Sequence, residues 1–428
     1  MGMLSAVGSL FKKIKEPVVK GRRPKEISLH DCLMSGLAVF SLKYASLLAF
    51  NKASASSNIL QHNLSTLFKI KAVPSDTYMR ERLDEVDPQD LRKAFTKIFA
   101  DAQRGKLLEQ FQYLDKHYLL SGDGTGFFSS PNVHCDNCCV KNHSDGTKTY
   151  YHQMFGGAIV HPKQKIVIPF APEPIMKGDG MSKNDCEMNA LKRFVHDFRR
   201  EHPHLKIIFL ADGLSSKAPF IIILNEAGMR YILGAKPGDH KALFEFVKND
   251  CKEYTYHGKD GKIHHYRYYN GAPLNDSNPD TLVNFLDYTE TDAKGKVQRF
   301  TWITDIEITE RNVHKIMKGG RARWKIENET FNTLKNQGYH FEHNFGHGNK
   351  NLSTVFAMLM VLAFLIDQIQ ELCDPLFQQA LLKKERKRYL WGDLLSLFIS
   401  FKISCWEDVW NALAYGHQAE DLRPFSRP

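Results

Sequence analysis

The chain has 428 residues, of which 43% are hydrophobic and 25% are charged. This composition is typical of a globular protein with two or three domains, and it excludes a disordered or fibrous chain. The net charge of +10 predicts attraction to an extended polyanion, with nucleic acid as the first candidate. Eight cysteines in a chain of this length do not form the pattern of a secreted disulfide framework, so we expect a reducing, cytoplasmic location.

Neither export nor a membrane span is expected. The basic residues near the start follow a weakly apolar stretch, which is the reverse of a signal peptide. The longest apolar run, Val355–Ile366, is shorter than the roughly 20 residues that a membrane-spanning helix needs. This run is therefore predicted to be a buried helix.

Residues 1–115 alternate basic and apolar segments, which predicts a small helical domain. Helices are expected over Leu29–Phe50, from Asp76 after a capping turn, and over Pro88–Phe111. The basic character favours DNA binding. A helical cap on the following domain is the alternative, because no helix-turn-helix spacing is evident.

Residues 116–348 predict an α/β domain. Three strands are expected first, then helix, strand, helix and strand, which together make a mixed sheet with helices on its faces. The strands are expected at His117–Phe128, Tyr150–Val160, Ile166–Phe170, Leu205–Leu210, Met229–Leu233 and Phe300–Ile308. A polar, aromatic and turn-rich stretch at about 235–299 predicts a β-rich antiparallel insertion.

Residues 349–428 predict a helical C-terminal region, a candidate for dimerisation or DNA contacts.

Two aspartates lie where strands present ligand-binding groups. Asp123 lies in SGDGTGFF, within the first strand, where the flanking glycines allow a phosphate or metal to approach the backbone. Asp212 ends the apolar strand in IIFLADGL, a position at which open sheets bind ligands. Taken alone, either aspartate is more typical of a turn or a strand-end hydrogen bond.

The segment RARWKIENETFNTLK, residues 321–335, is predicted to form a helix that brings in a third acid. At about 100° per residue, one face collects Arg323, Glu327, Phe331 and Leu334. Lys335 lies at the edge of this face and Glu329 on the opposite side. A solvated helix with i,i+4 charge pairs is the alternative interpretation.

Clustered carboxylates at Asp123, Asp212 and Glu327 would repel one another unless cations lay between them. The oxygen ligands favour Mg²⁺ or Mn²⁺. Two such ions about 4 Å apart activate the attacking oxygen and stabilise the leaving oxygen in phosphoryl transfer. The predicted chemistry is phosphodiester cleavage.

With these segments in place, the chain resembles the DDE transposases of bacterial insertion sequences, in the insertion-sequence-4 group, over roughly Leu119–Ser353. The resemblance rests on SGDGTGFF, on IIFLADGL, on the β-rich insertion and on RWKIENETFNTLK, which is similar to the group's closing motif Tyr-x2-Arg-x3-Glu-x6-Lys. It implies a ribonuclease H-like core that nicks the element's ends and joins the freed 3′ hydroxyl to target DNA. It also implies a homodimer on paired DNA ends, end binding by residues 1–115, and a location at the nucleoid.

The closing motif departs from the group's pattern at two positions. Gly320 occupies the tyrosine position, and Lys335 lies one residue beyond the expected lysine, where Leu334 stands. A frame with Glu329 as the catalytic acid fits less well, because Lys325 and Asn336 then take the arginine and lysine positions.

The resemblance also implies DNA contacts. Arg323 and Lys335 would hold phosphates near the scissile bond, arginine in a bidentate manner. Trp302 is the candidate to stack on a flipped base, with an ordinary core tryptophan as the alternative.

A second metal site is predicted near the first aspartate. Its candidate ligands, Cys135, Cys138, Cys139 and His143, with His134 beside them, have spacings that suit structural Zn²⁺. Reduced thiols in a loop are the alternative.

Further along, the glycine-rich end of HFEHNFGHG, residues 340–348, precedes a predicted helix whose free N–H groups are a candidate phosphate site. A simple glycine turn is the alternative.

Two other functions fit the same residues. One is a ribonuclease H-like nuclease or resolvase that does not transpose DNA. The other is a DNA-binding protein that descends from a transposase and no longer cuts. The three acids, all present, argue against the second.

Overall fold

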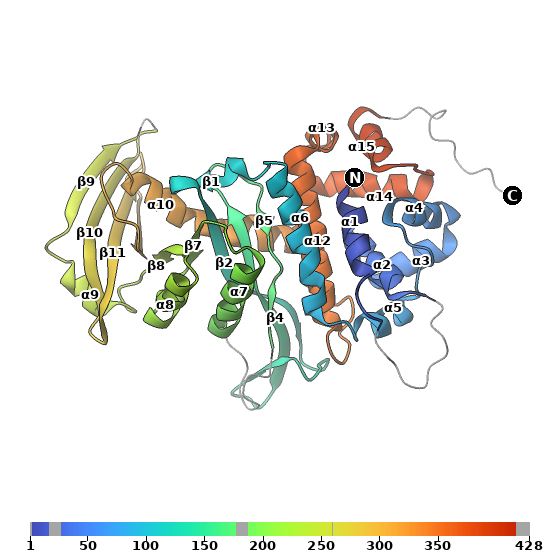
Figure 1. Cartoon of the computed structure of the whole chain (residues 1–428), viewed down its shortest axis with the longest axis horizontal. Coiled ribbons are helices and arrows are strands. Elements are labelled where there is room, and N and C mark those ends of the chain that lie inside the picture. Colours follow the sequence, from blue (N-terminus) through green and yellow to red (C-terminus); the bar gives the residue numbers. More distant parts are fainter. Residues whose placement is uncertain (1, 17–26, 177–186, 259, 417–428) are drawn as a thin grey trace.

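The computed structural model describes residues 2–16, 27–176, 187–258 and 260–416. Figure 1 shows a helical body that carries both ends of the described chain, next to a long sheet whose far edge lies at the opposite end of the molecule. The N-terminal helices are α1 (Gly2–Phe11), α2 (Leu29–Ser41), α3 (Leu47–Ser56), α4 (Asn58–Phe68), α5 (Asp76–Leu83) and α6 (Arg92–Arg104). The C-terminal helices are α12 (Leu352–Cys373), α13 (Pro375–Lys384), α14 (Lys387–Ser400) and α15 (Trp406–Tyr415).

Between these helices lies one mixed sheet. Its strands are β1 (Gln112–Tyr113), β2 (His117–Ser130), β3 (Cys139–Asn142), β4 (Lys148–Val160), β5 (Ile168–Pro169), β6 (Glu173–Ile175), β7 (Ile207–Ala211), β8 (Arg230–Gly234), β9 (Lys252–His257), β10 (Ile263–Asn275), β11 (Asn278–Thr291) and β12 (Val297–Thr304). The intervening helices are α7 (Glu187–Glu201), α8 (Ala218–Glu226), α9 (Lys241–Phe246) and α10 (Val313–Arg321).

The strand order is β3-β4-β2-β7-β8-β12-β11-β10-β9, with β1 paired to β2 and with β5 and β6 paired to β4. Strands β2, β7 and β8 run parallel, whereas β4 and the strands from β12 to β9 pair antiparallel. This order confirms the predicted α/β class with a mixed sheet. The strands within the predicted insertion, β9 to β11, continue the same sheet through β12.

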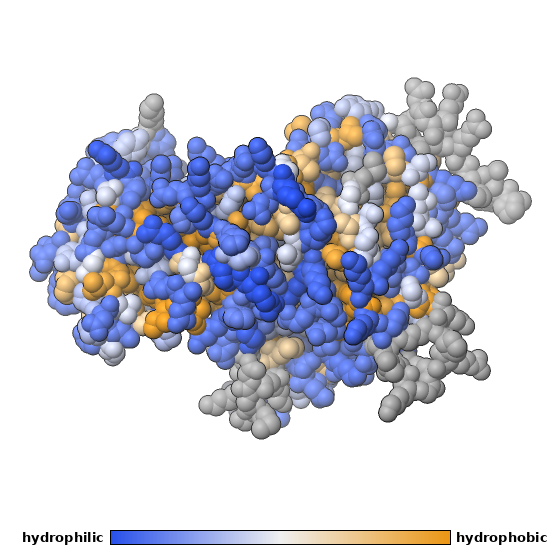
Figure 2. Space-filling model, in the orientation of Figure 1, coloured by the Kyte–Doolittle hydropathy of each residue, from blue (hydrophilic) through white to orange (hydrophobic). Residues whose placement is uncertain are grey.

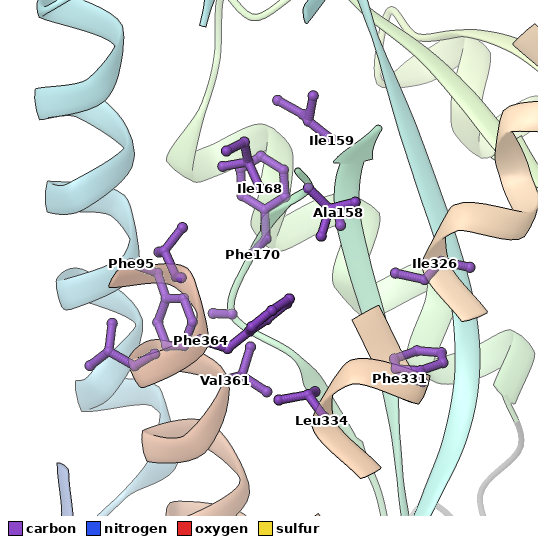
Figure 3. Close-up of a cluster of buried hydrophobic side chains, with 14 of the residues drawn as sticks. Phe95, Ala158, Ile159, Ile168, Phe170, Ile326, Phe331, Leu334, Val361 and Phe364 are labelled. Atoms are coloured by element: carbon purple, nitrogen blue, oxygen red, sulfur yellow. The ribbon is translucent and has the colours of Figure 1, made fainter. Parts of the chain in front are cut away.

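Helical elements cover both faces of the sheet. Consecutive residues of a strand point to opposite faces, and a Cβ on Gly156 would meet the ring of Phe331, whereas a Cβ on Gly157 would meet the ring of Phe194 in α7. The segment that contains Glu327 therefore packs on one face of β4 and α7 packs on the other. Figure 3 shows Ile326, Phe331 and Leu334 in the same hydrophobic cluster as side chains of α6, α12 and β4.

Helix α12 joins the helical body to the sheet. It contacts α2, α5, α6 and α13, and it also packs against β5. It is long and apolar enough to cross a membrane, but 94% of its most apolar stretch is buried inside the fold. The predicted buried helix over Val355–Ile366 is thus confirmed.

The prediction of a single helix over Leu29–Phe50 was wrong. Helix α2 ends at Ser41 and α3 begins at Leu47, with Lys43 between them in a left-handed conformation (φ 59°). The Lys43 ammonium lies 2.7 Å from the Asp367 carboxylate of α12. A tertiary ion pair therefore interrupts an apolar pattern that by itself predicts a continuous helix.

The prediction of a regular α-helix over residues 321–335 was also wrong. The segment forms a 3₁₀ turn (η5, Ala322–Trp324), a π-helical turn (η6, Ile326–Phe331) and a short α-helix (α11, Asn332–Asn336). The Asn332 N–H donates to the carbonyl of Glu327, five residues earlier, which is the hydrogen bond of a π turn. The wider turn buries Phe331 and Leu334 together with Ile326 and leaves Arg323 and Glu327 off that buried face.

Candidate functional site

Asp123 lies in β2, and Asp212 directly follows the adjacent parallel strand β7. Ser121 of β2 pairs with Leu210 of β7, and each aspartate lies two residues beyond its member of that pair. The Asp212 carboxylate also accepts a hydrogen bond from the Leu214 N–H at 3.0 Å, which caps the turn after β7. Parallel pairing thus carries both acids to the same edge of the sheet.

Arg323 links the first strand to the π-helical turn. Its guanidinium lies 3.3 Å from the Asp123 carboxylate and 2.9 Å from the Glu327 carboxylate. The Ser121 hydroxyl donates to the Arg323 carbonyl at 2.9 Å, which fixes the backbone there. The structure therefore brings Asp123, Arg323 and Glu327 together, although they come from segments about 200 residues apart.

Glu187, which the sequence analysis missed, is a fourth carboxylate at this site. It is the first residue of α7, and its carboxylate lies so close to Gly124 that a Cβ there would approach it to 2.5 Å. The Gly124 N–H itself donates to the Asp123 carboxylate at 2.9 Å. One glycine of SGDGTG thus admits an acidic side chain of the protein. The sequence signal was an acid in the first turn of a helix that packs on the sheet.

The acids raise one another's affinity for protons. Burial raises the pKa of Asp123 to about 7; Arg323 opposes the rise, and the nearby Glu187 and Glu327 carboxylates add to it. Burial also raises the pKa of Glu187, with a further contribution from Asp212. Two of these carboxylates pair with the Arg323 guanidinium, and Glu187 and Asp212 add further negative charge nearby, which is the condition under which cations bind.

The donor set fits Mg²⁺ or Mn²⁺ in chemistry, because all four groups offer carboxylate oxygens. Among the residues that the structure describes, the one group of three or more side chains with ligand atoms all within 4.8 Å is a cysteine–histidine cluster. The four carboxylates are thus spread more widely than a single shared ion requires.

Lys335 lies next to the part of β2 that follows Asp123, where it shares a cavity with residues 126–129. Its ammonium is 2.8 Å from the Glu342 carboxylate, and it lines a cavity of about 650 Å³ with Lys141 and His143. Leu334, which occupies the motif's lysine position, is fully buried. The π turn, which takes more residues per turn than an α-helix, leaves residue 335 and not residue 334 partly exposed.

Trp302, the predicted base-stacking residue, lies in the core. It is 6% exposed, and a Cβ on Gly320 would approach its indole to 2.6 Å. The indole therefore fills the space that a side chain at 320 would need, so this position requires glycine. The more exposed indole nearby belongs to Trp324, which is 48% exposed with the Arg323 guanidinium over its ring.

A cavity of about 630 Å³ lies between strands β9 to β11 and helix α10. Its basic lining residues are Lys163, Lys262, Lys318, Arg321 and Lys325. Two of them, Lys262 and Arg321, pair with Glu290. Figure 2 shows that the face presented in that view is mostly hydrophilic, with hydrophobic side chains in small separate areas.

The predicted cysteine–histidine site needs a correction. Cys135 and Cys138 cluster with His152 of β4 and His347, not with Cys139 and His143. The Cys139 thiol points to the Ile175 carbonyl, and His143 pairs with Thr149 at 2.7 Å. His134 stacks on Tyr150. No local spacing could have found His347, because it lies 209 residues after Cys138.

The candidate phosphate site at the start of α12 was wrong. The Asp84 carboxylate accepts hydrogen bonds from four successive backbone N–H groups at 2.9–3.0 Å. These groups belong to Asn349, Lys350, Asn351 and Leu352. An internal acid therefore occupies the helix N-terminus that a phosphate would need.

Neither a protein-family model nor a curated protein matches this chain. Its function is therefore argued from the site.

Proposed function

We propose that this protein is a metal-dependent DNA-cleaving enzyme of the DDE transposase type, which cuts the ends of a mobile element and joins the 3′ hydroxyl to target DNA. The observation that carries the proposal is that Arg323 pairs with both Asp123 and Glu327, while Glu187 lies close enough to raise the pKa of Asp123 and Asp212 close enough to raise the pKa of Glu187. A purely structural acid would be expected to have a matching base of its own.

The order of the elements supports the finer assignment to a ribonuclease H-like core. Strand β2 pairs antiparallel with β4 and parallel with β7, and β8 extends the parallel part. Two acids then lie at one edge of the central strands, and Glu327 approaches from a later segment. Open sheets bind ligands at such an edge.

Each side chain has a proposed role. Asp123, Asp212 and Glu327 would hold the divalent ions, with Glu187 as an additional oxygen ligand. When bound, two such ions activate the attacking oxygen and stabilise the leaving oxygen. Arg323 would orient Asp123 and Glu327 before the ions bind and could then contact a phosphate. Lys335 and Lys141 would hold the DNA backbone beside the site.

The basic cavity supports a DNA partner. Lys318 and Lys163 line the cavity and are exposed. The Lys325 ammonium donates a hydrogen bond to the Gln164 carbonyl, which holds this charged group in the cavity lining. We propose that a strand of DNA follows this cavity towards Arg323. Trp324, which is exposed, replaces Trp302 as the proposed stacking residue.

The test is nicking of labelled DNA taken from both sides of the coding region, where short inverted repeats are expected. Mg²⁺ or Mn²⁺ should support cleavage, and Ca²⁺ should not, because its larger and looser coordination shell fits the in-line geometry poorly. Products in which the cut end is joined to target DNA would distinguish transposition from simple nuclease action. If the protein binds this DNA but does not cleave it with either Mg²⁺ or Mn²⁺, only the alternative of a non-cutting DNA-binding protein would remain.

A dimer on paired ends belongs to the same proposal. Light scattering of the protein with end DNA should give two chains per complex. A complex with one chain under conditions that support joining would contradict it.

A further inference from the structure

The cluster of Cys135, Cys138, His152 and His347 has the dimensions of a metal site. The two Sγ atoms lie 3.9 Å apart. His152 Nε2 lies 3.4 Å from the Sγ of Cys135 and 3.5 Å from that of Cys138, and His347 Nε2 lies 3.3 Å from Cys138 Sγ. All four ligand atoms lie within 4.8 Å of one another.

These distances match tetrahedral zinc. With Zn–S near 2.3 Å and Zn–N near 2.0–2.1 Å, tetrahedral angles put two sulfurs about 3.8 Å apart and a sulfur and a nitrogen about 3.5 Å apart. A disulfide would instead hold its sulfurs at about 2.05 Å, and both cysteines are free thiols. Two thiolates and two imidazoles are a donor set that selects zinc.

The surroundings of the cluster favour a closed structural site. Cys138, His152 and His347 are all less than 9% exposed, and aromatic rings flank the imidazoles. Phe127 stacks on His152, and Phe128 packs on His347. Four protein ligands leave no position for a substrate, which is typical of structural and not catalytic zinc.

We propose that this cluster binds one structural Zn²⁺, which ties the segment between α11 and α12 to β4 and to the loop between β2 and β3. His347 is the only ligand from that segment, and the Asn137 side chain supports it by donating to the Lys350 carbonyl at 2.7 Å. The same segment carries Glu342, the partner of Lys335. The ion thus fixes the segment that follows the Glu327 turn. This inference does not depend on the proposed function.

The first test is the metal itself. Full-length protein purified under reducing conditions should retain about one zinc per chain after dialysis, by elemental analysis. X-ray absorption should show two sulfur and two nitrogen ligands at the distances given above. Protein without zinc, zinc with only nitrogen and oxygen ligands, or a Cys135–Cys138 disulfide in the freshly purified chain would overturn the proposal.

The second test maps the ligands. Cys138→Ser and His347→Gln should each lower zinc content at least about tenfold, whereas Cys139→Ser and His143→Gln, the matched neighbours outside the cluster, should keep it. Chelation of the parent should lower the Tm by about 5 °C or more and speed hydrogen exchange over residues 340–351. Equal zinc in all four variants, or no change in exchange on chelation, would overturn the assignment; the chelation arm does not require any variant to fold.

Discussion

Two regions of this molecule place acids beside bases, and they differ in charge balance. In the core between α2 and α12, the Asp367 carboxylate pairs with the Lys43 ammonium at 2.7 Å and accepts the Tyr339 hydroxyl at 2.5 Å. The Lys43 ammonium also lies over the rings of Tyr339 and Trp391. One acid there meets one base and one donor, and the charges cancel.

At the sheet edge, Asp123 and Glu327 share Arg323, and the pKa of Asp123 rises to about 7 because the site is buried and crowded with negative charge. The comparison teaches that a buried acid by itself says little about function. The acid–base pair of Asp367 and Lys43 is neutral and holds two helical segments together. The acids at the sheet edge outnumber their base, so the site can still bind cations.

The largest expected effect is on cleavage. Asp212→Asn and Glu327→Gln should each lower the rate of end-DNA nicking by about a thousandfold or more, because both substitutions remove a charged group proposed as a metal ligand. DNA binding should survive. Glu329→Gln is the matched control and should keep most activity, since Glu329 takes no part in the contacts of Arg323 described above. The assignment of the third acid fails if Glu329→Gln is inactive while Glu327→Gln cuts normally.

The next effect is on stability and tests the matched pair. Asp367→Ala leaves the Lys43 ammonium buried without its counter-ion and should lower the free energy of unfolding by about 3–5 kcal/mol. The double substitution Lys43→Met with Asp367→Leu removes both charges and should recover most of that loss. Urea denaturation of the three proteins measures it. If Asp367→Ala is as stable as the parent, the pair does not order the helices.

A smaller effect concerns pH. The folded chain holds a proton on Asp123 up to pH about 7, whereas the unfolded chain releases it near 4. Between these values the folded state binds more protons, so the stability of the metal-free protein should fall as the pH rises, by an amount on the order of 2 kcal/mol.

Thermal unfolding from pH 4 to 8 measures this slope. Asp123→Asn should flatten it, and Mg²⁺ should oppose the loss at high pH because it binds the deprotonated form. An unchanged slope in the variant would show that other groups cause the dependence.

The smallest effect concerns DNA affinity. The plot of log affinity against log salt concentration should be steep and linear, and Lys318→Ala should reduce its slope by about 1 if this lysine contacts a phosphate. Lys97→Ala is the control, because Lys97 lies on α6 and pairs with Asp101. Equal slopes for the two variants would remove the basic cavity from the DNA path.

Local pattern was enough to predict the central strands of the sheet. Strands β2, β4, β7 and β8 lie within a few residues of their predicted positions, because their apolar runs are bounded by glycine, proline and polar residues. Asp123 and Asp212 could be proposed as neighbours because parallel strands present their carboxyl ends at one edge.

Sequence alone therefore determined the fold class, the buried nature of α12 and the three acids worth testing, since each depends on hydrophobic periodicity or on a strand end. Tertiary structure decided the rest. Glu187 reaches Gly124, Lys43 interrupts a helix for Asp367, and His347 joins Cys138 across 209 residues. The π turn after Arg323 likewise follows from packing Ile326 and Phe331 into one core. These contacts join segments that are far apart in the chain. The spacing of residues within one segment carries no information about which side chain of a distant segment will contact it.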